Sequence, residues 1–515
     1  MTQPRVLLVT SEAVPLVKTG GLADVIGALA ATLSTHGVDV SILMPGYPAA
    51  MSGALGLKKL DELPDLPGGG GELYQGNMPD TGVKVLLMRS DRFDNRIANP
   101  YVDNTGHEFD DNALAFASLA HTAVQICEGK TSIPVPHVVH ANDWHAGLIP
   151  ALLHTKDITH IGSVLTIHNL AFQGNYAAEL APMLGIPAEL LNSDGMEFWG
   201  KLSFLKAGVS YANRVTTVSE TYAKEILTER FGYGFQDALN KRKHDLHAIP
   251  NGVDVNTWNP ATDPLIKRNF SKDNLSGKAA CKRDLQKIFN LPVEQFVPLM
   301  GIGSRITHQK MADVVLAALP DIMLKHPRLQ IALLGCGEPQ YEQAFLDMAA
   351  QYPDRIGVFI GYDERRAHAL HAGADLLLHP TRFEPFGLTP IYSMLYGTLP
   401  IASRVGGMCD TITDAGDELT PASGATGILF DGEEAADLGR AVDRALNLYA
   451  RPSAWQVVQR NAIHGDFSWD GPARAYIEMY ADIAPPAAKE SFLRLLAPNV
   501  TSVANEPSPH YKMTA

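Results

Sequence analysis

The chain has 515 residues, of which 46% are hydrophobic and 19% are charged, and this composition excludes collagen, coiled coils and global disorder. At roughly 100–200 residues per domain, the length predicts two large α/β domains or three small ones. There are 56 acidic and 42 basic residues, for a formal net charge of −14, and no stretch concentrates Lys and Arg. A nucleic-acid partner is therefore not expected, because such proteins need a basic surface.

No apolar run in the sequence approaches the roughly 20 residues of a membrane helix, so no membrane partner is expected. The apolar run at residues 6–9 is too short for a signal-peptide core, and we expect a cytoplasmic protein. Cys127, Cys281, Cys336 and Cys409 are far apart in the sequence. We therefore expect free thiols and no structural zinc.

Short β-branched runs alternate with amphipathic stretches in the first half of the chain, a pattern typical of parallel sheets covered by helices. A helix is predicted at residues 22–34, with Gly37 as its C-terminal cap. The predicted strands are residues 5–10, 40–44, 83–88, 137–140, 163–167, 214–218 and 247–249.

The same pattern begins again in the second half, which predicts a second Rossmann-like domain with a helix at residues 312–325. The predicted strands here are residues 298–303, 329–334, 356–360, 375–379 and 399–402. The predicted organisation is a first domain at 1–258, a polar hinge at 259–282, a second domain at 283–470, a helix at 471–485 and a tail at 486–515. Because it is rich in Pro, Ala, Ser and Asn, the tail is predicted to be mostly disordered.

Ligands of open α/β sheets bind beyond the carboxyl ends of the strands, so the residues after each strand are candidates for a site. Lys18, Gly20 and Gly21 follow the first strand and lead into a helix. Backbone N–H groups and the ammonium group at such a place can bind an anion. The pattern is neither a Walker loop nor G-x-G-x-x-G, and it fits a plain turn before a helix equally well.

Other polar residues follow strands in both halves of the chain. Asp143 and His168 follow two strands of the first half, although His168 alone also fits a structural histidine. Arg305 and Lys310 follow the first strand of the second half, where they suit a departing diphosphate or form an exposed basic turn. Glu384 precedes a Pro-x-Gly turn before a helix and offers a carboxylate to hydroxyl groups.

Together these motifs resemble those of bacterial glycogen synthases and plant starch synthases, in that family's order from residue 5 to about residue 483. The matching motifs are KTGGLADV at 18–25, HANDWHAG at 140–147, TIHNLAFQG at 166–174, NGVD at 251–254 and RFEPFGLT at 382–389. The resemblance implies an α/β fold in the GT-B arrangement, with a deep cleft between two Rossmann-like domains and a C-terminal helix crossing back to the first. It also implies transfer of glucose from ADP-glucose to the non-reducing 4-hydroxyl of glycogen or another α-1,4-glucan. Retention at the anomeric carbon, and no cofactor or metal ion, are implied as well.

The resemblance implies a catalytic role for five residues. Asp143 and His168 lie on the glucose side, with His168 binding a sugar hydroxyl. Arg305 and Lys310 neutralise the leaving phosphate, and Glu384 binds a glucose hydroxyl. We expect front-face transfer, in which the departing phosphate takes the proton of the acceptor hydroxyl, rather than a covalent glucosyl-enzyme on a carboxylate.

The resemblance also implies a set of substrate-binding residues. Tyr362 matches the aromatic residue that stacks on the adenine, and the amides of Gly387 and Leu388 assist Glu384. The full set is Lys18, Gly20, Gly21, Tyr101, Asn251, Tyr362, Phe386, Gly387, Leu388 and Thr389.

Four positions depart from the family's usual residues. Phe386 stands where Cys or a small residue is common, and we expect its ring to reshape the sugar pocket. Met311 stands where Gly is usual, and we expect it to shift the loop that carries Lys310. Asn142 and Pro390 replace a common His and a common Gln.

Two alternatives remain open from the sequence. One is a related transferase that uses another nucleotide sugar, UDP-glucose among them, or a small acceptor. The other is a catalytically weak glucan-binding regulator. A phosphorylase of the same plan is disfavoured, because those chains are longer and need a lysine-bound pyridoxal. The sequence carries no signal for an oligomeric state.

Overall fold

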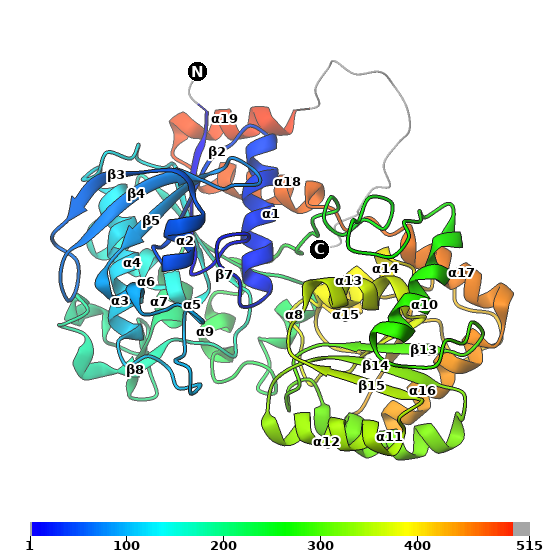
Figure 1. Ribbon diagram of the computed structural model, residues 1–515. Helices are drawn as coiled ribbons and strands as arrows, with labels where there is room; N and C mark the ends of the chain where they lie inside the picture. Colours follow the sequence, from blue (N-terminus) through cyan, green and yellow to red (C-terminus); the bar gives the residue numbers. More distant parts are fainter. Residues whose placement is uncertain (1–2, 498–515) are drawn as a thin grey trace.

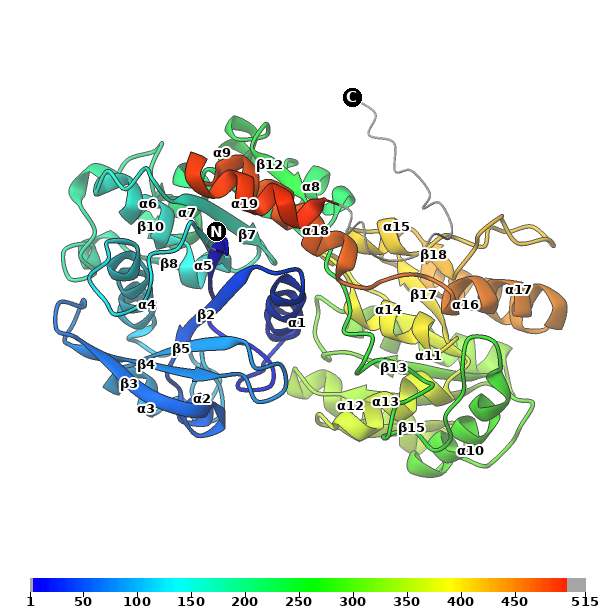
Figure 2. The same cartoon turned by 90° about the horizontal axis from the view of Figure 1, so that it is seen from above.

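The computed structural model describes residues 3–497, which form two α/β domains side by side (Figure 1). Each domain is built on a mainly parallel sheet with helices on both faces, and the view from above shows the two sheets as separate bodies (Figure 2). Each sheet has its own hydrophobic core. The α/β fold with two Rossmann-like domains is thus confirmed.

The first sheet has the strand order β12-β11-β7-β6-β1-β2-β5-β4-β3. Strand β1 pairs in parallel with β2 on one side and β6 on the other, so the direction of winding reverses between β1 and β6. Such a reversal opens a crevice at the carboxyl ends of the strands. The strands are β1 (Arg5–Val9), β2 (Asp39–Pro45), β3 (Leu55–Leu63), β4 (Gly71–Asn77), β5 (Lys84–Arg89), β6 (Val138–Asn142), β7 (Gly162–Ile167), β11 (Arg214–Thr217) and β12 (Leu246–Ala248).

Two parts of the first domain were not predicted. The antiparallel strands β3 and β4 extend one edge of the sheet, and a small antiparallel sheet has the order β8-β10-β9. Pairing along β3 shifts register twice, which removes the strict alternation that identifies a strand in a sequence. The small sheet consists of β8 (Asn175–Ala177), β9 (Glu197–Phe198) and β10 (Lys201–Ser203).

The second sheet has the order β15-β14-β13-β16-β17-β18. Strand β13 pairs with β14 and β16, so this sheet has a reversal of its own between β13 and β16. The strands are β13 (Leu299–Gly303), β14 (Gln330–Gly335), β15 (Ile356–Ile360), β16 (Leu376–His379), β17 (Leu399–Ser403) and β18 (Ile428–Phe430). The five predicted strands are confirmed to within one residue at each end, and β18 is additional.

The helices cover both faces of each sheet, and Gly37 follows α1 with φ of +94°, as its predicted capping role requires. Those of the first domain are α1 (Gly21–Thr35), α2 (Pro48–Gly53), α3 (Asp91–Asp94), α4 (Asn112–Cys127), α5 (Asp143–Ala146), α6 (Leu148–Thr155), η1 (Ala178–Leu180), η2 (Ala188–Leu190), α7 (Phe204–Tyr211), α8 (Glu220–Glu225) and α9 (Gln236–Lys241). Those of the second are η3 (Leu275–Gly277), α10 (Lys278–Ile288), α11 (Ala312–Lys325), α12 (Pro339–Gln351), α13 (Glu364–Gly373), α14 (Leu388–Leu395), α15 (Gly407–Thr411), α16 (Ala435–Tyr449) and α17 (Pro452–Ile463).

The chain crosses between the domains twice, and the two crossings lie side by side. The Val253 N–H donates to the Phe467 carbonyl oxygen at 2.7 Å. Gly252 is packed against Trp469 so closely that a Cβ atom would lie 2.6 Å from the indole ring. Glycine at this position therefore allows the two crossings to touch.

The predicted hinge at 259–282 is not a free linker. Ile266, Phe270 and Cys281 are buried in the core of the second domain, and Asp263 and Lys278 are buried with polar partners. The polar residues of this stretch therefore include side chains that form buried hydrogen bonds within the second domain. The chain passes between the domains at 251–254 and 466–469 instead.

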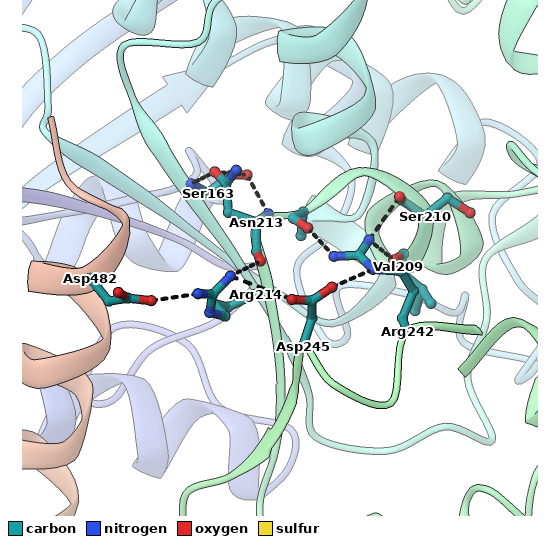
Figure 3. A network of polar contacts seen from close by, with 9 residues as sticks. Ser163, Val209, Ser210, Asn213, Arg214, Arg242, Asp245 and Asp482 are labelled. Carbon is teal, nitrogen blue, oxygen red and sulfur yellow. Dashed lines mark hydrogen bonds and ion pairs between the residues drawn. The ribbon is translucent and has the colours of Figure 1, made fainter. Parts of the chain in front are cut away.

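After the second crossing, the chain returns to the first domain as α18 (Asp470–Ile483) and α19 (Pro486–Leu496), drawn in orange and red (Figure 1). Figure 3 shows Asp482 of α18 ion-paired with Arg214 of β11, within a network that includes Asp245 and Arg242. His140 of β6 lies 2.8 Å from the Tyr480 hydroxyl. The predicted crossing-back of the C-terminal helix is thus confirmed.

The prediction of disorder from residue 486 is wrong for residues 486–496. Pro486 begins α19, and proline suits the first position of a helix because its missing N–H is not needed there. Ala488 and Phe492 are buried in the first domain's core, and the Phe492 ring lies 5.9 Å from that of Tyr480. Residues 498–515 of the predicted tail lie outside the described residues.

All four cysteines are free thiols, as expected. Across residues 3–497, no helix is long and apolar enough to cross a membrane.

Candidate active site

The two domains meet where α1 and α14 begin. A Cβ atom built on Gly21, the first residue of α1, would lie 3.3 Å from Cδ1 of Leu388, the first residue of α14. The N-termini of two helices from different domains therefore face the same place. Because the first N–H groups of a helix are unpaired and its dipole is positive there, this junction favours an anion.

The loop before α1 is held by a buried carboxylate. Glu12 follows β1 and is 3% exposed, and it accepts hydrogen bonds from the N–H and hydroxyl of Thr19. The Tyr101 hydroxyl lies 3.1 Å from the same carboxylate and 2.7 Å from Ser11 Oγ. Burial raises the pKa of Glu12. Glu12 and Tyr101 therefore fix the loop that carries Lys18, Gly20 and Gly21.

Lys18 itself is partly exposed and forms an ion pair with Asp24 of α1 at 2.9 Å. Gly20 is the N-cap of that helix, and its Cβ position is open space. A ligand anion could take the place of Asp24 as the partner of Lys18. The two side chains are 36% and 26% exposed, and exposed ion pairs contribute little to stability.

Asp143 follows β6 in a left-handed conformation, with φ of +55°. Its Oδ1 accepts hydrogen bonds from the N–H groups of His168, at 2.7 Å, and Asn169, at 3.3 Å. Burial raises the pKa of Asp143 to about 7, although these N–H groups oppose the rise. The carboxylate is thus directed at the backbone after β7, where it holds His168 in place.

The His168 ring has a defined hydrogen-bonding partner. Asn142 Nδ2 donates to the carbonyl oxygens of Val9 and His140, so Asn142 Oδ1 is an acceptor toward His168 Nε2, 3.0 Å away. Burial lowers the pKa of His168 to about 3. The ring is therefore neutral, with its hydrogen on Nε2, and Nδ1 is left as an acceptor for a ligand hydroxyl.

Three titratable side chains meet at the reversal of the second sheet. The Lys310 ammonium donates to the Glu384 carboxylate. His379, the last residue of β16, lies 3.2 Å from Glu384 Oε2 and 3.4 Å from Lys310 Nζ. Burial opposes ionisation of Glu384, but Lys310 and His379 outweigh it and lower its pKa to about 2. Glu384 is therefore a carboxylate.

Arg305 lies in the same loop as Lys310 but is exposed, and its guanidinium donates to Gln309 at 2.9 Å. Gln309 Nε2 donates to the carbonyl oxygen of Phe383, and Gln309 accepts from the N–H of Arg382. The loop of Arg305 and Lys310 is thus tied to the loop of Glu384.

The structure does not show the effects expected of Met311 and Phe386, because both side chains are buried in the core of the second domain. Met311 adopts a left-handed conformation, with φ of +53°, and its side chain is fully buried. Glycine would be unstrained at this backbone conformation, but burial of the Met311 side chain anchors the loop. Phe386 is 5% exposed and packs in the core of the second domain, so its ring is a packing group rather than part of a sugar-facing surface.

The other predicted substrate-binding residues lie in three places. Gly387, with φ of +92°, is the N-cap of α14, and Thr389 is in its first turn. Tyr362 is 66% exposed after β15, and its hydroxyl donates to Glu364. Asn251 is buried at the first crossing between domains. The charge of Lys18 lowers the pKa of Glu364, and the charge of Asp24 raises the pKa of Tyr362. The loop of Tyr362 and Glu364 therefore lies near α1 of the first domain.

Further contacts between the domains lie beside the loop of Glu384. The Thr221 N–H and hydroxyl of α8 donate to Asp410 at 3.0 and 2.6 Å. The rings of Tyr233 and Phe383 lie 5.5 Å apart in an edge-to-face arrangement. These contacts hold the second domain against the first in the conformation described here.

The structure therefore brings the catalytic candidates into two groups, with Asp143 and His168 in the first domain and Arg305, Lys310 and Glu384 in the second. Sequence reasoning did not assign site roles to Glu12, Gln309 and His379. Each of them contacts a predicted site residue. His379 and Glu12 end or follow strands at the reversal points, which is the signal that could have identified them. Among residues 3–497, no cluster of three or more His, Cys, Asp or Glu side chains suits a metal ion.

Comparisons with known proteins agree with this arrangement. Residues 5–241 match the family described as the starch synthase catalytic domain, and residues 287–461 match glycosyl transferases group 1. A protein named glycogen synthase from Ralstonia nicotianae is 50% identical over 482 residues, covering 94% of this chain and 88% of that protein. A glycogen synthase from Bordetella bronchiseptica is 48% identical over 512 residues, covering 98% of this chain and 100% of that protein.

Among solved structures, the catalytic domain of starch synthase IV from Arabidopsis thaliana, bound to ADP and acarbose, has a TM-score of 0.83 and is 27% identical. The structural alignment covers 94% of this chain and 99% of the plant domain. The 50% identity to the Ralstonia protein over nearly the whole chain and the matching two-domain fold lead to one assignment. The chain belongs to the glycogen synthase and starch synthase family of glycosyltransferases.

Proposed function

We propose that this chain transfers glucose from ADP-glucose to the 4-hydroxyl at the non-reducing end of an α-1,4-glucan, with retention and without a metal ion. The observation that carries the proposal is the junction of Gly21 and Leu388, where two helix N-termini from different domains meet. Gly387, beside Leu388, would place a Cβ 3.4 Å from the Glu384 side chain, which in turn binds Lys310. The two helix N-termini and Lys310 create a positive potential at this junction. The diphosphate is the negatively charged part of the donor, so we place it there.

In this proposal the charges of Arg305 and Lys310, with the two helix N-termini, stabilise the phosphate as its bond to the glucose C1 breaks. A bound divalent ion commonly does this work in other nucleotide-sugar transferases. Lys18 exchanges its partner Asp24 for the diphosphate. The donor therefore needs no metal bridge between protein and phosphate.

The proposed transfer occurs on one face of the sugar. The C1–O bond to the phosphate breaks, the acceptor oxygen bonds to C1 from the same side, and the acceptor's proton passes to the departing phosphate oxygen. Retention then needs no carboxylate nucleophile. The orientation of Asp143 supports this route, because its Oδ1 is committed to the N–H groups of His168 and Asn169.

Two residues would orient the glucose. His168 Nδ1 is the free acceptor on a neutral ring, and Glu384 is ionised and fixed by Lys310 and His379. Both can accept hydrogen bonds from sugar hydroxyls. They come from opposite domains, so the sugar would lie between them. We place the reaction in the cytoplasm, as the sequence leads us to expect.

The configuration of the first product tests this proposal. Proton NMR of the chain-extended oligosaccharide, made with ADP-glucose in excess EDTA, should show the new anomeric proton as an α-linkage from the start of the reaction. A β-linked product would contradict retention. Activity that EDTA abolishes and that Mg²⁺ or Mn²⁺ restores would contradict metal independence, and glycogen binding without turnover would favour the regulator alternative.

A further inference from the structure

A buried histidine lies behind the loop of Tyr362, between two carboxylates. The His368 side chain on α13 is 2% exposed. Its Nδ1 lies 2.7 Å from Asp263 Oδ2, and its Nε2 lies 3.4 Å from Glu364 Oε1. Nδ1 is hydrogen-bonded to Asp263, whereas the contact of Nε2 with Glu364 is an ion pair without a hydrogen bond. Burial opposes the charged form, but the two carboxylates outweigh it and raise the pKa of His368 to about 8.

The inner carboxylate, Asp263, is fixed on every side. It is 1% exposed, and its Oδ2 also accepts a hydrogen bond from the Tyr396 hydroxyl at 2.6 Å. Its Oδ1 accepts from the N–H of Leu265 at 2.8 Å. Asp263 therefore attaches the segment that enters the second domain to α13 and α14.

The same segment contributes a stacked ring. The Trp258 indole lies between the His368 imidazole, 4.1 Å away at 10°, and the Tyr392 ring, 3.9 Å away at 9°. A protonated imidazole over an indole face is attracted by the ring's quadrupole as well as by stacking. Tyr392 belongs to α14, the helix whose N-terminus meets Gly21. The stack thus joins the entering segment to both helices.

The outer carboxylate, Glu364, connects this cluster to the domain junction. Its side chain is 43% exposed and accepts a hydrogen bond from the Tyr362 hydroxyl. The contact with His368 leads the effects that lower the pKa of Glu364 to about 2, and Lys18 of the first domain adds to them. Glu364 is therefore a carboxylate held from inside by His368, while Tyr362 is held by Glu364.

We propose that His368 is a positioning residue for the nucleotide part of the donor. Through Glu364 it fixes the ring of Tyr362, and through Asp263 and Trp258 it fixes that loop to the segment by which the chain enters the second domain. The inference rests on the proposed function and on the contact of Tyr362 with the adenine of the donor, which the family resemblance implies. His368 itself touches no substrate in this scheme.

The proposal separates binding from chemistry. Without His368, Glu364 loses its inner partner and Tyr362 loses its fixed position, so ADP should bind more weakly. The group of Lys310 and Glu384 has its own partners and should still act on donor that is bound. Loss of one charge-assisted interaction predicts about a tenfold rise in the dissociation constant of ADP and in the KM of ADP-glucose. The kcat should stay within about threefold of wild type.

The matched control is His371, three residues along α13. It is also buried, and its ring meets Trp258 and Tyr392 at their edges, 5.5 and 6.0 Å away. Its Nδ1 is buried without a hydrogen-bond partner, and burial lowers the pKa of its ring to about 3, so the ring is neutral. Like His368→Phe, the variant His371→Phe replaces a buried imidazole beside the same stack by a phenyl ring. Unlike His368→Phe, it leaves the ion pairs with Asp263 and Glu364 in place.

The experiment is calorimetric titration of ADP into the full chain, together with donor kinetics on glycogen, for wild type, His368→Phe, His368→Gln and His371→Phe. We expect a weakened ADP affinity in His368→Phe, partial recovery in His368→Gln, whose amide still donates to one carboxylate, and less than a twofold change in His371→Phe. Glu364→Gln keeps the size of the side chain at a partly exposed position, and it should weaken ADP binding as well.

Unchanged ADP affinity in His368→Phe, or an equal loss in His371→Phe, would overturn the inference while leaving the proposed function intact. A fall in kcat with KM unchanged would also overturn it. If His368→Phe does not fold, Glu364→Gln decides, and wild-type affinity in that variant counts against the proposal. Wild-type protein that binds no ADP in the same titration would contradict the proposed function itself.

Discussion

Gly21 of the first domain lies against Leu388 of the second, with 3.3 Å between the Cβ position of Gly21 and Cδ1 of Leu388. Each residue is the first of its helix. The junction of the domains is thus formed by two helix N-termini. Lys18 lies in the loop that leads to α1, and Lys310 binds Glu384 in the loop that leads to α14. This arrangement provides positive potential for an anion only while the domains are together.

Enlarging Gly21 should separate the helix N-termini. We expect Gly21→Val to lower kcat/KM for ADP-glucose roughly 10–100-fold, because a displacement of about 1 Å is enough to disturb a preorganised site. Truncating the facing side chain in the double variant Gly21→Val with Leu388→Ala should restore part of the loss. Steady-state kinetics of both variants and of Leu388→Ala alone test the pair. Additive losses in the double variant would show that the two residues do not act through their contact.

Removing the cations should slow the chemical step. Arg305→Ala and Lys310→Ala should each lower kcat by about 10²-fold or more, as is typical when a preorganised charge-stabilising group is lost. Arg305 is exposed, so its variant should keep the stability of wild type. Lys310→Ala also leaves the buried Glu384 carboxylate without its ammonium partner, so its melting temperature should fall.

Lys325→Ala, on the far end of α11 with a 64% exposed side chain, is the matched control for these two variants. It should have wild-type kcat. Wild-type turnover in Arg305→Ala or Lys310→Ala would mean that the loop has a structural role only.

Replacing Asp143 distinguishes a positioning carboxylate from a nucleophile. Asp143→Asn keeps an oxygen that can accept from the N–H groups of His168 and Asn169, so we expect only about a tenfold loss of kcat, the scale of one weakened hydrogen bond. Asp143→Ala should be more impaired but still active. Mass spectrometry with a slow fluorinated donor should find no glucosyl-enzyme, and a glucose trapped on Asp143 would refute front-face transfer.

The stability of the second domain should depend on the protonation of His368. Its pKa is raised from 6.5 to about 8 in the folded chain, so its contribution is fully present below pH 6.5 and is lost as the pH rises through 8. A shift of this size corresponds to roughly 2 kcal/mol. In urea unfolding, the difference in free energy of unfolding between wild type and His368→Phe should therefore shrink by roughly 2 kcal/mol from pH 6 to pH 9. A difference that is the same at both pH values would contradict the ion-pair assignment.

Much of the fold could be predicted because buried parallel strands leave a direct signal in the sequence. Strands such as β7, buried along its whole length, appear as short β-branched runs, and α11 was predicted with its exact bounds. Strand β3 could not be identified, because its bulges disrupt the alternation of apolar residues. Helix α19 was missed because Pro485 and Pro486 suggested a break, whereas a proline also favours the start of a helix.

The site was predictable to the extent that its residues follow strand ends. Lys18, His168, Arg305 and Glu384 all do so, and the family resemblance gave them roles. The partners that hold them could not be predicted, because a buried network joins residues far apart in the sequence. His368 and Asp263 are separated by 105 positions, and the polar stretch that contains Asp263 looked like a solvent-exposed hinge.

The most direct test of the proposed reaction is a comparison of two donors on one glycogen primer. Initial rates with labelled ADP-glucose and UDP-glucose should be measured in excess EDTA, for wild type and for Lys310→Ala. The account predicts incorporation of glucose into glycogen from ADP-glucose, a kcat/KM at least tenfold lower with UDP-glucose, and a loss of about 10²-fold or more in Lys310→Ala. Incorporation that requires a metal ion, a preference for UDP-glucose, or no incorporation from either donor would contradict it.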